Sequence, residues 1–343
     1  MRYRMLGNTG FYVSEICLGT MTFGGKGFFK AVGQVDQKAA TALISKALEA
    51  GVNFIDTADV YSEGMAESFV GRALKEIGAK RSDVVIATKV YGRMSQAPND
   101  AGLSRGHIID AVQASLDRLQ TDHIDLYQVH AQDFVTPVEE VLQALNDLVR
   151  QGLVRYVGVS NWQAWRIMKA QGIADKHGWT RFESLQAYYS IVGRDIERDI
   201  VPMLEDQKMG LMVWSPLAGG ILSGKFGPHH QGPDGARRTS FDFPPVDKDL
   251  AWALVAAMRE IGTAKGVSVA RVALAYVLAK PFVTSLIVGA KTLDQLGDNL
   301  AAAELSLATD EIERLDKLSA LRPEYPGWMV ERQNDPRRMP QPK

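Results

Sequence analysis

The chain has 343 residues, of which 46% are hydrophobic and 23% are charged, as is typical of a soluble globular protein. Its formal net charge of -1 gives no electrostatic reason to expect nucleic acid or an anionic membrane as a partner. Cys17 is the only cysteine, which excludes an intrachain disulfide. An apolar signal segment and a stretch of about 20 apolar residues are both absent, so we expect a cytoplasmic protein without a membrane span.

The chain begins with a hairpin pattern over residues 3–14, in which YRML and FYVS flank the turn sequence GNTG. After it, short apolar runs alternate eight times with amphipathic helical patterns. The apolar runs lie at 16–19, 53–56, 84–89, 124–129, 154–160, 184–187, 211–214 and 285–290. The eight helical patterns lie at 36–50, 65–78, 104–120, 137–151, 162–176, 196–208, 247–265 and 292–304, and one additional pattern lies at 268–279.

Eight strand–helix units of this size predict an α/β fold of the (β/α)8 type, a TIM barrel whose sites lie at the carboxyl ends of its strands. A doubly wound sheet is the alternative, but it usually carries a glycine fingerprint and a helix directly after the first strand. Here GTMTFGG follows the first run, and no helical pattern begins before residue 36. We expect residues 1–343 to form one barrel domain, with a cofactor-covering loop at 216–246 and an irregular, proline-rich tail at 321–343.

The barrel brings the residues that follow its strands to one end. Many of these residues are polar or aromatic: Thr20, Asp56, Lys89, His130, Ser160, Asn161, Gln186, Trp214, Ser215 and Lys291. Strand ends also collect polar residues simply because they meet solvent, and for any single position that explanation competes. A phenol, an ammonium, an imidazole and a carboxylate that converge favour a functional site instead.

Tyr61 lies just beyond Asp56, and it supplies the phenol of this site. An unperturbed tyrosine has a pKa near ~10, and a neighbouring cation such as Lys89 favours the phenolate and lowers that value. Asp56 would hold Lys89 charged, and His130 would hydrogen-bond the group that receives the proton. This chemistry suits the conversion of a carbonyl group to an alcohol.

Other strand-end residues suggest a nicotinamide cofactor. Asn161 and Gln186 carry donors and acceptors that match a carboxamide, and Trp214 offers a flat face for a ring to stack on. Lys291 begins the last helical unit, where a helix N-terminus and a lysine would together favour a 2′-phosphate. We therefore expect NADP(H) to be preferred over NAD(H), although an ordinary surface lysine is the alternative.

The loop at 216–246 contains a near match to a phosphate-binding P-loop. Its sequence GGILSGK at 219–225 is followed by Phe226 and no helical pattern, so nucleotide hydrolysis is not expected. Lys225 and Arg238 are still candidates for a phosphate contact. The adjacent histidines at 229–230 lack the spacing of metal ligands, and we expect no metal.

Eight segments resemble the aldo-keto reductase superfamily and follow its order through nearly the whole chain: LGTMTFGG, FIDTADVY, ATKV, YQVH, GVSNW, LQAYYS, VWSPLAGGILSGK and VGAKTLDQLGDNL. The chain looks most similar to the bacterial branch that also resembles potassium-channel β subunits. The resemblance implies that Asp56, Tyr61, Lys89 and His130 are a catalytic tetrad with Tyr61 as the general acid.

The resemblance also implies cofactor contacts along the chain. Ser160, Asn161 and Gln186 would hold the nicotinamide carboxamide, and Trp214 would stack on the ring. The pyrophosphate loop would comprise Ser215, Leu217 and Lys225, and the adenosine end would contact Gly289, Lys291, Gln295, Asp298 and Asn299.

These observations predict an NADP(H)-dependent oxidoreductase that reduces a small aldehyde or ketone, or oxidises the alcohol. Phe23, Tyr91 and, from the tail, Trp328 are candidates for an apolar substrate mouth. The alternative is a redox-sensing partner that binds NADP(H) and turns over only incidentally. A barrel glycosidase is disfavoured because it needs two carboxylates, and only Asp56 follows a strand.

Overall fold

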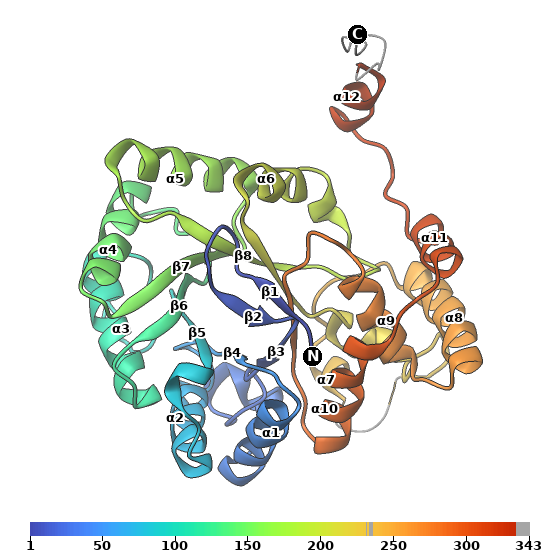
Figure 1. Cartoon of the computed structure of the whole chain (residues 1–343), viewed down its shortest axis with the longest axis horizontal. Coiled ribbons are helices and arrows are strands. Elements are labelled where there is room, and N and C mark those ends of the chain that lie inside the picture. Colours follow the sequence, from blue (N-terminus) through green and yellow to red (C-terminus); the bar gives the residue numbers. More distant parts are fainter. Residues whose placement is uncertain (231, 233–235, 334–343) are drawn as a thin grey trace.

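The computed structural model describes residues 1–230, 232 and 236–333, with only the backbone for residues 237 and 240. Eight parallel strands close into a barrel with the order β10-β3-β4-β5-β6-β7-β8-β9 (Figure 1). The strands are β3 (Ile16–Gly19), β4 (Phe54–Asp56), β5 (Val85–Val90), β6 (Ile124–Val129), β7 (Val154–Ser160), β8 (Phe182–Tyr188), β9 (Gly210–Trp214) and β10 (Ser285–Val288). The predicted (β/α)8 barrel is confirmed.

Helices surround the barrel on its outside (Figure 1). The longer ones are α1 (Gln37–Glu49), α2 (Met65–Ile77), α3 (Arg105–Leu119), α4 (Val138–Arg150), α5 (Ala164–His177), α6 (Ile200–Gln207), α8 (Lys248–Lys265), α9 (Val269–Leu278), α10 (Leu293–Leu300) and α11 (Thr309–Leu318). Short 3-10 helices are η1 (Gly27–Ala31), η2 (Arg81–Asp83), η3 (Asp195–Glu197), η4 (Ala218–Ser223) and η5 (Ala301–Glu304). Among the described residues, no helix alone is long and apolar enough to cross a membrane; α8 and α9 meet those criteria only as a pair bent by 100°.

The helix–barrel packing follows from apolar spacing. In α4, the residues buried against the barrel are Val138, Val141, Leu142, Ala144, Leu145 and Leu148. This i, i+3, i+4 pattern places every apolar side chain on one face of the helix. Helix α11 was not predicted from the sequence, and Leu315 is the only fully buried one of its ten residues.

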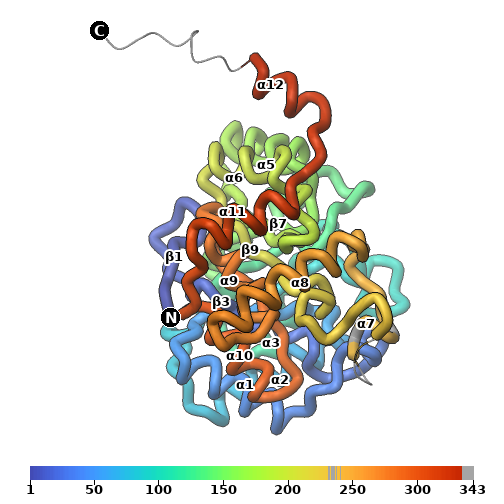
Figure 2. Tube along the Cα trace, turned by 90° about the vertical axis from the view of Figure 1, so that its right-hand side faces the viewer, coloured from blue at the N-terminus to red at the C-terminus, as the bar shows by residue number. Residues whose placement is uncertain are grey.

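Two predicted connections have more structure than expected. The connection at 216–246 contains η4 and a four-residue helix, α7 (Arg237–Ser240); residues 231 and 233–235 lie outside the described part of the chain. Within the tail predicted as irregular, α12 (Gly327–Gln333) is helical, and residues 334–343 again lie outside the description. Figure 2 shows α12 projecting away from the barrel.

The hairpin of β1 (Tyr3–Met5) and β2 (Tyr12–Ser14) covers the amino-terminal end of the barrel (Figure 1). Leu6 and Val13 are fully buried there, in one cluster with Phe54, Leu126 and Met212 from the barrel strands. The hairpin therefore closes the floor, and the carboxyl ends of the strands form the open mouth of the barrel.

We expect Gly7→Ala to destabilise this floor. Gly7 has a φ of +60°, and a Cβ there would lie 2.1 Å from the carbonyl oxygen of Glu183. Left-handed backbone and overpacking should together lower the free energy of unfolding by about 2 kcal/mol or more. Urea denaturation measures the loss, with Gly10→Ala as the matched control, since a Cβ at Gly10 meets nothing within 4 Å. Equal losses in both variants would contradict the close approach at Gly7.

Candidate active site

Lys89 lies at the centre of the predicted site and is fully buried at the end of β5. Its Nζ donates to Asp56 Oδ2 at 2.6 Å, to the Thr57 carbonyl at 2.8 Å and to Tyr61 Oη at 3.3 Å. An ammonium has three protons to donate, so these three acceptors satisfy it. The structure thus brings three of the four predicted catalytic residues into direct contact.

The surroundings of Lys89 keep it charged. Burial alone would lower the pKa of Lys89, but the neighbouring Asp56 and Tyr61 and their hydrogen bonds more than offset that effect, and the pKa is raised above its usual value. Lys89 is therefore an ammonium at neutral pH, and it stands beside the Tyr61 hydroxyl as a fixed positive charge.

The second oxygen of Asp56 is bound by two buried amides. Asp56 Oδ1 accepts hydrogen bonds from Gln186 Nε2 at 2.8 Å and from Gln128 Nε2 at 3.3 Å. The two amides also contact each other, since Gln186 Nε2 lies 3.3 Å from Gln128 Oε1. The amide nitrogen of Gln186 thus faces Asp56, and the contact of Gln186 with a carboxamide stays a prediction.

Gln128 was not among the predicted site residues. It is fully buried in β6, on the same side of the strand as Leu126, which belongs to the buried cluster beneath the hairpin. The available signal was a polar residue two positions before His130 in an apolar run, since alternate strand residues face the same way. Gln128 lies within its strand, whereas the residues predicted for the site are expected to follow the strands.

His130 completes the predicted group of four. Its ring lies 5.7 Å from the Tyr61 ring, centroid to centroid, in an edge-to-face arrangement. Partial burial and the nearby positive charge of Lys89 lower the pKa of His130 to about 3. The imidazole is therefore neutral above this pH, and it can hydrogen-bond a ligand without carrying a charge.

Asn161 connects His130 with Trp214. Its Nδ2 donates to the His130 carbonyl at 3.1 Å and to Ser160 Oγ at 2.9 Å, and its Oδ1 accepts from Trp214 Nε1 at 3.0 Å. Ser160 Oγ in turn donates to the Gln186 carbonyl at 3.0 Å. The residues predicted around a nicotinamide thus form one network beside the residues predicted for proton transfer.

Arg238 stabilises the loop after β9 through contacts with other residues of that loop. The buried guanidinium donates to the Ala218 carbonyl at 3.0 Å and also contacts Asp242 and the Pro244 carbonyl. Ser215 Oγ accepts from the amide of Gly219 at 2.9 Å, which tightens the start of the same loop. Arg238 therefore supports the loop internally, whereas Lys225 is exposed to solvent on it and Leu217 is half-buried.

Residues predicted for the adenosine end gather between β10 and α10. The Lys291 amide donates to Gln295 Oε1 at 2.9 Å, and Asn299 Nδ2 lies 3.5 Å from the Gly289 carbonyl. Lys291 Nζ donates to Gln34 Oε1 at 2.7 Å, a partner that the sequence did not indicate.

Asp298 differs from the rest of this set. Its carboxylate binds Ser268 Oγ at 2.6 Å and Arg271 Nη2 at 2.8 Å, both on the α9 side. The Asp298 carboxylate is therefore engaged on the α9 side, and its contact with adenosine stays a prediction.

These residues fit a dinucleotide. Strands β9 and β10 are neighbours in the barrel, so the loop after β9 and the start of α10 lie side by side. Lys225, Lys291 and the amino-terminal turn of α10 offer positive charge to phosphate groups, and Trp214 offers a half-buried ring face.

The remaining predicted residues are dispersed. Thr20 is buried and its Oγ1 donates to the Asp56 carbonyl at 3.1 Å, which positions the backbone of Asp56. Phe23 is fully buried in the core, so its ring packs among protein atoms and not at an open surface. Tyr91 is half-buried after β5. Trp328 lies in α12, which projects away from the barrel, and is not brought to the site (Figure 2).

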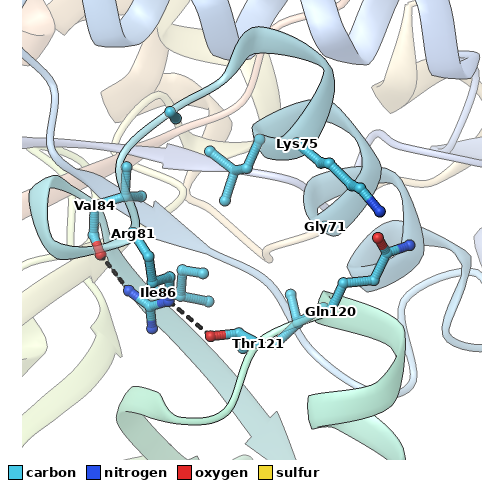
Figure 3. A pocket seen from close by; sticks show the side chains of 10 residues that line it. Gly71, Lys75, Arg81, Val84, Ile86, Gln120 and Thr121 are labelled. Atoms are coloured by element: carbon cyan, nitrogen blue, oxygen red, sulfur yellow. Dashed lines mark hydrogen bonds between the residues drawn. The ribbon is translucent and has the colours of Figure 1, made fainter.

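A cavity of about 240 Å³ lies elsewhere, between α2, η2 and the end of α3 (Figure 3). Its lining includes Lys75, Gln120 and Arg81, and Arg81 is bound to Thr121 Oγ1 at 2.8 Å and to the Val84 carbonyl at 2.6 Å. Because Val84 precedes β5, this cavity lies at the closed end of the barrel and is separate from the candidate active site.

Comparison with known proteins agrees with the geometry. Residues 15–320 match the model of the Aldo/keto reductase family. An uncharacterized oxidoreductase, YrpG, of Bacillus subtilis is 38% identical, over 93% of this chain and 96% of the relative. Versiconal hemiacetal acetate reductase of Aspergillus parasiticus is 35% identical, over 95% and 99% of the two chains. A probable voltage-gated potassium channel subunit beta of Oryza sativa subsp. japonica is also 35% identical, over 94% and 96%.

These matches confirm the resemblance predicted from the sequence. They support an oxidoreductase that reduces carbonyl groups, in a family whose members generally use NAD(P)H.

Gln128→Met should reveal whether the buried amides position Asp56. Loss of a hydrogen bond to a charged group costs about 1.5–3 kcal/mol, so kcat for carbonyl reduction should fall about ten- to a hundredfold. A less firmly held Asp56 also supports the Lys89 charge less well, so the alkaline decline of kcat should begin at lower pH.

Gln171→Met is the matched control. Gln171 is an equally buried amide that donates to the Phe182 carbonyl at 2.9 Å, away from Asp56. It should reduce stability without moving the pH profile. A pH profile that is unchanged in Gln128→Met would exclude the positioning role.

Proposed function

The chain belongs to the aldo/keto reductase family, and we propose that it is an NADP(H)-dependent oxidoreductase that reduces an aldehyde or ketone to the alcohol, or catalyses the reverse. The observation that carries this proposal is the contact of the buried Lys89 ammonium with Tyr61 Oη at 3.3 Å. A hydroxyl group beside a fixed cation, at the open end of the barrel, is suited to give up a proton.

The proposed reaction transfers one hydride and one proton. When bound, NADPH supplies the hydride to the carbonyl carbon from C4 of its dihydronicotinamide. The O–H bond of Tyr61 breaks as its proton moves to the carbonyl oxygen, and a solvent proton later restores the phenol. One carbonyl, one NADPH and one proton are consumed for each alcohol and NADP⁺ formed.

Lys89 and Asp56 act together in this step. As the Tyr61 proton leaves, negative charge develops on Oη, and the ammonium at 3.3 Å stabilises it in a site removed from water. Asp56, at 2.6 Å, keeps Lys89 charged and fixed in place, so little reorganisation is needed during the reaction.

His130 has a separate role in the proposal. With a pKa of about 3, it holds no transferable acidic proton at neutral pH. It therefore serves as a neutral donor that orients the carbonyl oxygen, and Tyr61 is the acid.

The proposed cofactor site extends from Trp214 to α10. Trp214 would stack on the nicotinamide, with Ser160, Asn161 and Gln186 nearby. Ser215, Leu217 and Lys225 would border the pyrophosphate. Lys291 would attract the 2′-phosphate, together with the amino-terminal turn of α10.

A regulatory partner is the second candidate function. Relatives from Oryza sativa and Arabidopsis thaliana carry the name of probable voltage-gated potassium channel subunits. A pure sensor of NADP(H) has no need for a proton donor, and the contact of Lys89 with Tyr61 therefore favours the enzyme. Multiple turnovers of NADPH with simple aldehydes would distinguish the two functions.

Tyr61→Phe tests the proposed acid directly. General acid catalysis contributes about 10²–10⁴-fold, so kcat should fall at least a hundredfold while the Kd for NADPH stays within a factor of two. Steady-state kinetics and fluorescence titration measure the two quantities. Tyr156→Phe, in β7, is the control and should retain full activity. Comparable turnover in Tyr61→Phe and the control would remove Tyr61 from the mechanism.

Lys291→Glu tests the cofactor preference. Loss of a charged contact with the 2′-phosphate costs about 1.5–3 kcal/mol, so the Kd for NADPH should rise at least tenfold more than the Kd for NADH. Lys38→Glu, an exposed change on α1, provides the same charge change as a control. An equal loss of affinity for NADPH and NADH in Lys291→Glu would argue against a 2′-phosphate contact.

A further inference from the structure

Aromatic rings continue outward from Tyr61 over the mouth of the barrel. The Tyr61 ring contacts Phe29 of η1 at a centroid distance of 5.2 Å. Phe29 contacts Phe28 at 5.5 Å, and Phe28 contacts Phe241, from the loop after β9, at 5.7 Å. Two connections far apart in the sequence therefore meet through one edge-to-face pair, Phe28 and Phe241.

The series continues to the predicted cofactor residue. Phe241 contacts Phe243 at 5.5 Å, and Phe243 lies nearly parallel to Trp214, at 5.8 Å and 11°. Trp214 is then linked through the Asn161 side chain to the carbonyl of His130, whose ring contacts Tyr61. The contacts therefore form a closed circuit, and we call its five outer rings the aromatic rim: Phe28, Phe29, Phe241, Phe243 and Trp214.

The aromatic rim surrounds the space between Tyr61 and Trp214, where the proposed reaction would take place. The carbonyl group must lie within reach of Tyr61, and the cofactor ring must lie on Trp214. The remainder of the substrate is attached to the carbonyl carbon and has to lie against the rim. All five members are aromatic, and Phe28 and Phe243 are 75% and 39% exposed. Large exposed apolar groups at the mouth of a site are typical of a surface that a ligand covers.

The ring geometry favours an aromatic ligand over a saturated one. Phe28 stands at 87° to Phe29 and at 88° to Phe241, so the rim presents both ring edges and ring faces. Aromatic pairs in edge-to-face or offset-stacked contact gain about 0.5–1.5 kcal/mol beyond the burial of area. A saturated ring of the same size buries similar area but lacks this gain.

We propose that the rim selects aryl aldehydes and aryl ketones over saturated carbonyl compounds of equal size, with Phe28 and Phe241 as specificity-determining residues. This inference rests on the proposed carbonyl reduction at Tyr61. Two or more ring contacts correspond to a preference of about tenfold.

The test compares matched substrates in the full-length protein with NADPH. The kcat/KM for benzaldehyde should exceed that for cyclohexanecarbaldehyde at least tenfold. Calorimetry with the NADP⁺-loaded protein should show the same order for the alcohols, with benzyl alcohol bound more tightly than cyclohexylmethanol. The calorimetric ratio reports on the rim without requiring chemistry.

Substitutions separate aromaticity from apolar area. Phe28→Leu and Phe241→Leu keep an apolar side chain. They should reduce two ratios towards one: kcat/KM for benzaldehyde over that for cyclohexanecarbaldehyde, and the affinity for benzyl alcohol over that for cyclohexylmethanol. Phe28→Tyr keeps the aromatic ring and should retain both ratios. Tyr12→Ala removes an exposed ring from the closed end of the barrel and should leave both ratios unchanged.

The outcomes distinguish the rim from the proposed function. Equal kcat/KM values for the two aldehydes, or an undiminished preference in both leucine variants, would overturn the role of the rim. If Tyr61-dependent reduction of both aldehydes persisted in that case, the proposed function would still hold. If neither aldehyde were reduced, the proposed function would fail, and the calorimetric ratio alone would decide whether the rim binds aryl groups.

Discussion

The arrangement of the site depends on satisfying one buried ammonium. Removing a lone ammonium from water costs several kcal/mol, so a fully buried lysine requires well-placed partners. Lys89 obtains all three of its acceptors from one turn, at Asp56, Thr57 and Tyr61. The backbone ties the same turn to β5, because the Asp59 amide donates to the Lys89 carbonyl at 3.2 Å. The buried charge therefore fixes the turn, and the turn fixes the Tyr61 hydroxyl.

A second group of buried polar residues lies next to the turn that carries Asp56, Thr57 and Tyr61. Glu67 binds Arg118 at 2.7 Å and also contacts the Thr88 hydroxyl, while Asp59 lies fully buried nearby. Burial and the neighbouring Glu67 raise the pKa of Asp59 well above its usual value, which favours its protonated form. The two cations in this region are each balanced by a carboxylate, Lys89 by Asp56 and Arg118 by Glu67. Such a balance avoids the cost of an unpaired charge in a site removed from water.

Local pattern was sufficient to predict the strands of the barrel, and a parallel barrel necessarily gathers the residues at its strand ends. The predicted runs at 16–19, 124–129 and 154–160 have the same bounds as β3, β6 and β7. Gln128 was not predicted because its hydrogen bond to Asp56 depends on which side of β6 faces inward. The contact between Phe28 and Phe241 depends on how two loops fold towards each other, which no local periodicity encodes. The orientation of the Asp298 carboxylate depends on Arg271 and Ser268, whose proximity no local pattern encodes either.

Asn161 links the residues proposed for proton transfer to the residues proposed to bind the nicotinamide. Its backbone is left-handed, with a φ of 60°, which costs a non-glycine residue roughly 1 kcal/mol. That conformation directs one short side chain to the His130 carbonyl, Ser160 Oγ and the Trp214 indole at once. Three hydrogen bonds at about 0.5–1.5 kcal/mol each offset the strain. These bonds join the strand-end residues on the Tyr61 side to the Trp214 ring. The barrel strands therefore set the distance between the proposed proton donor, Tyr61, and the proposed stacking surface, Trp214. The loops that carry the aromatic rim are then able to vary around a fixed reaction centre.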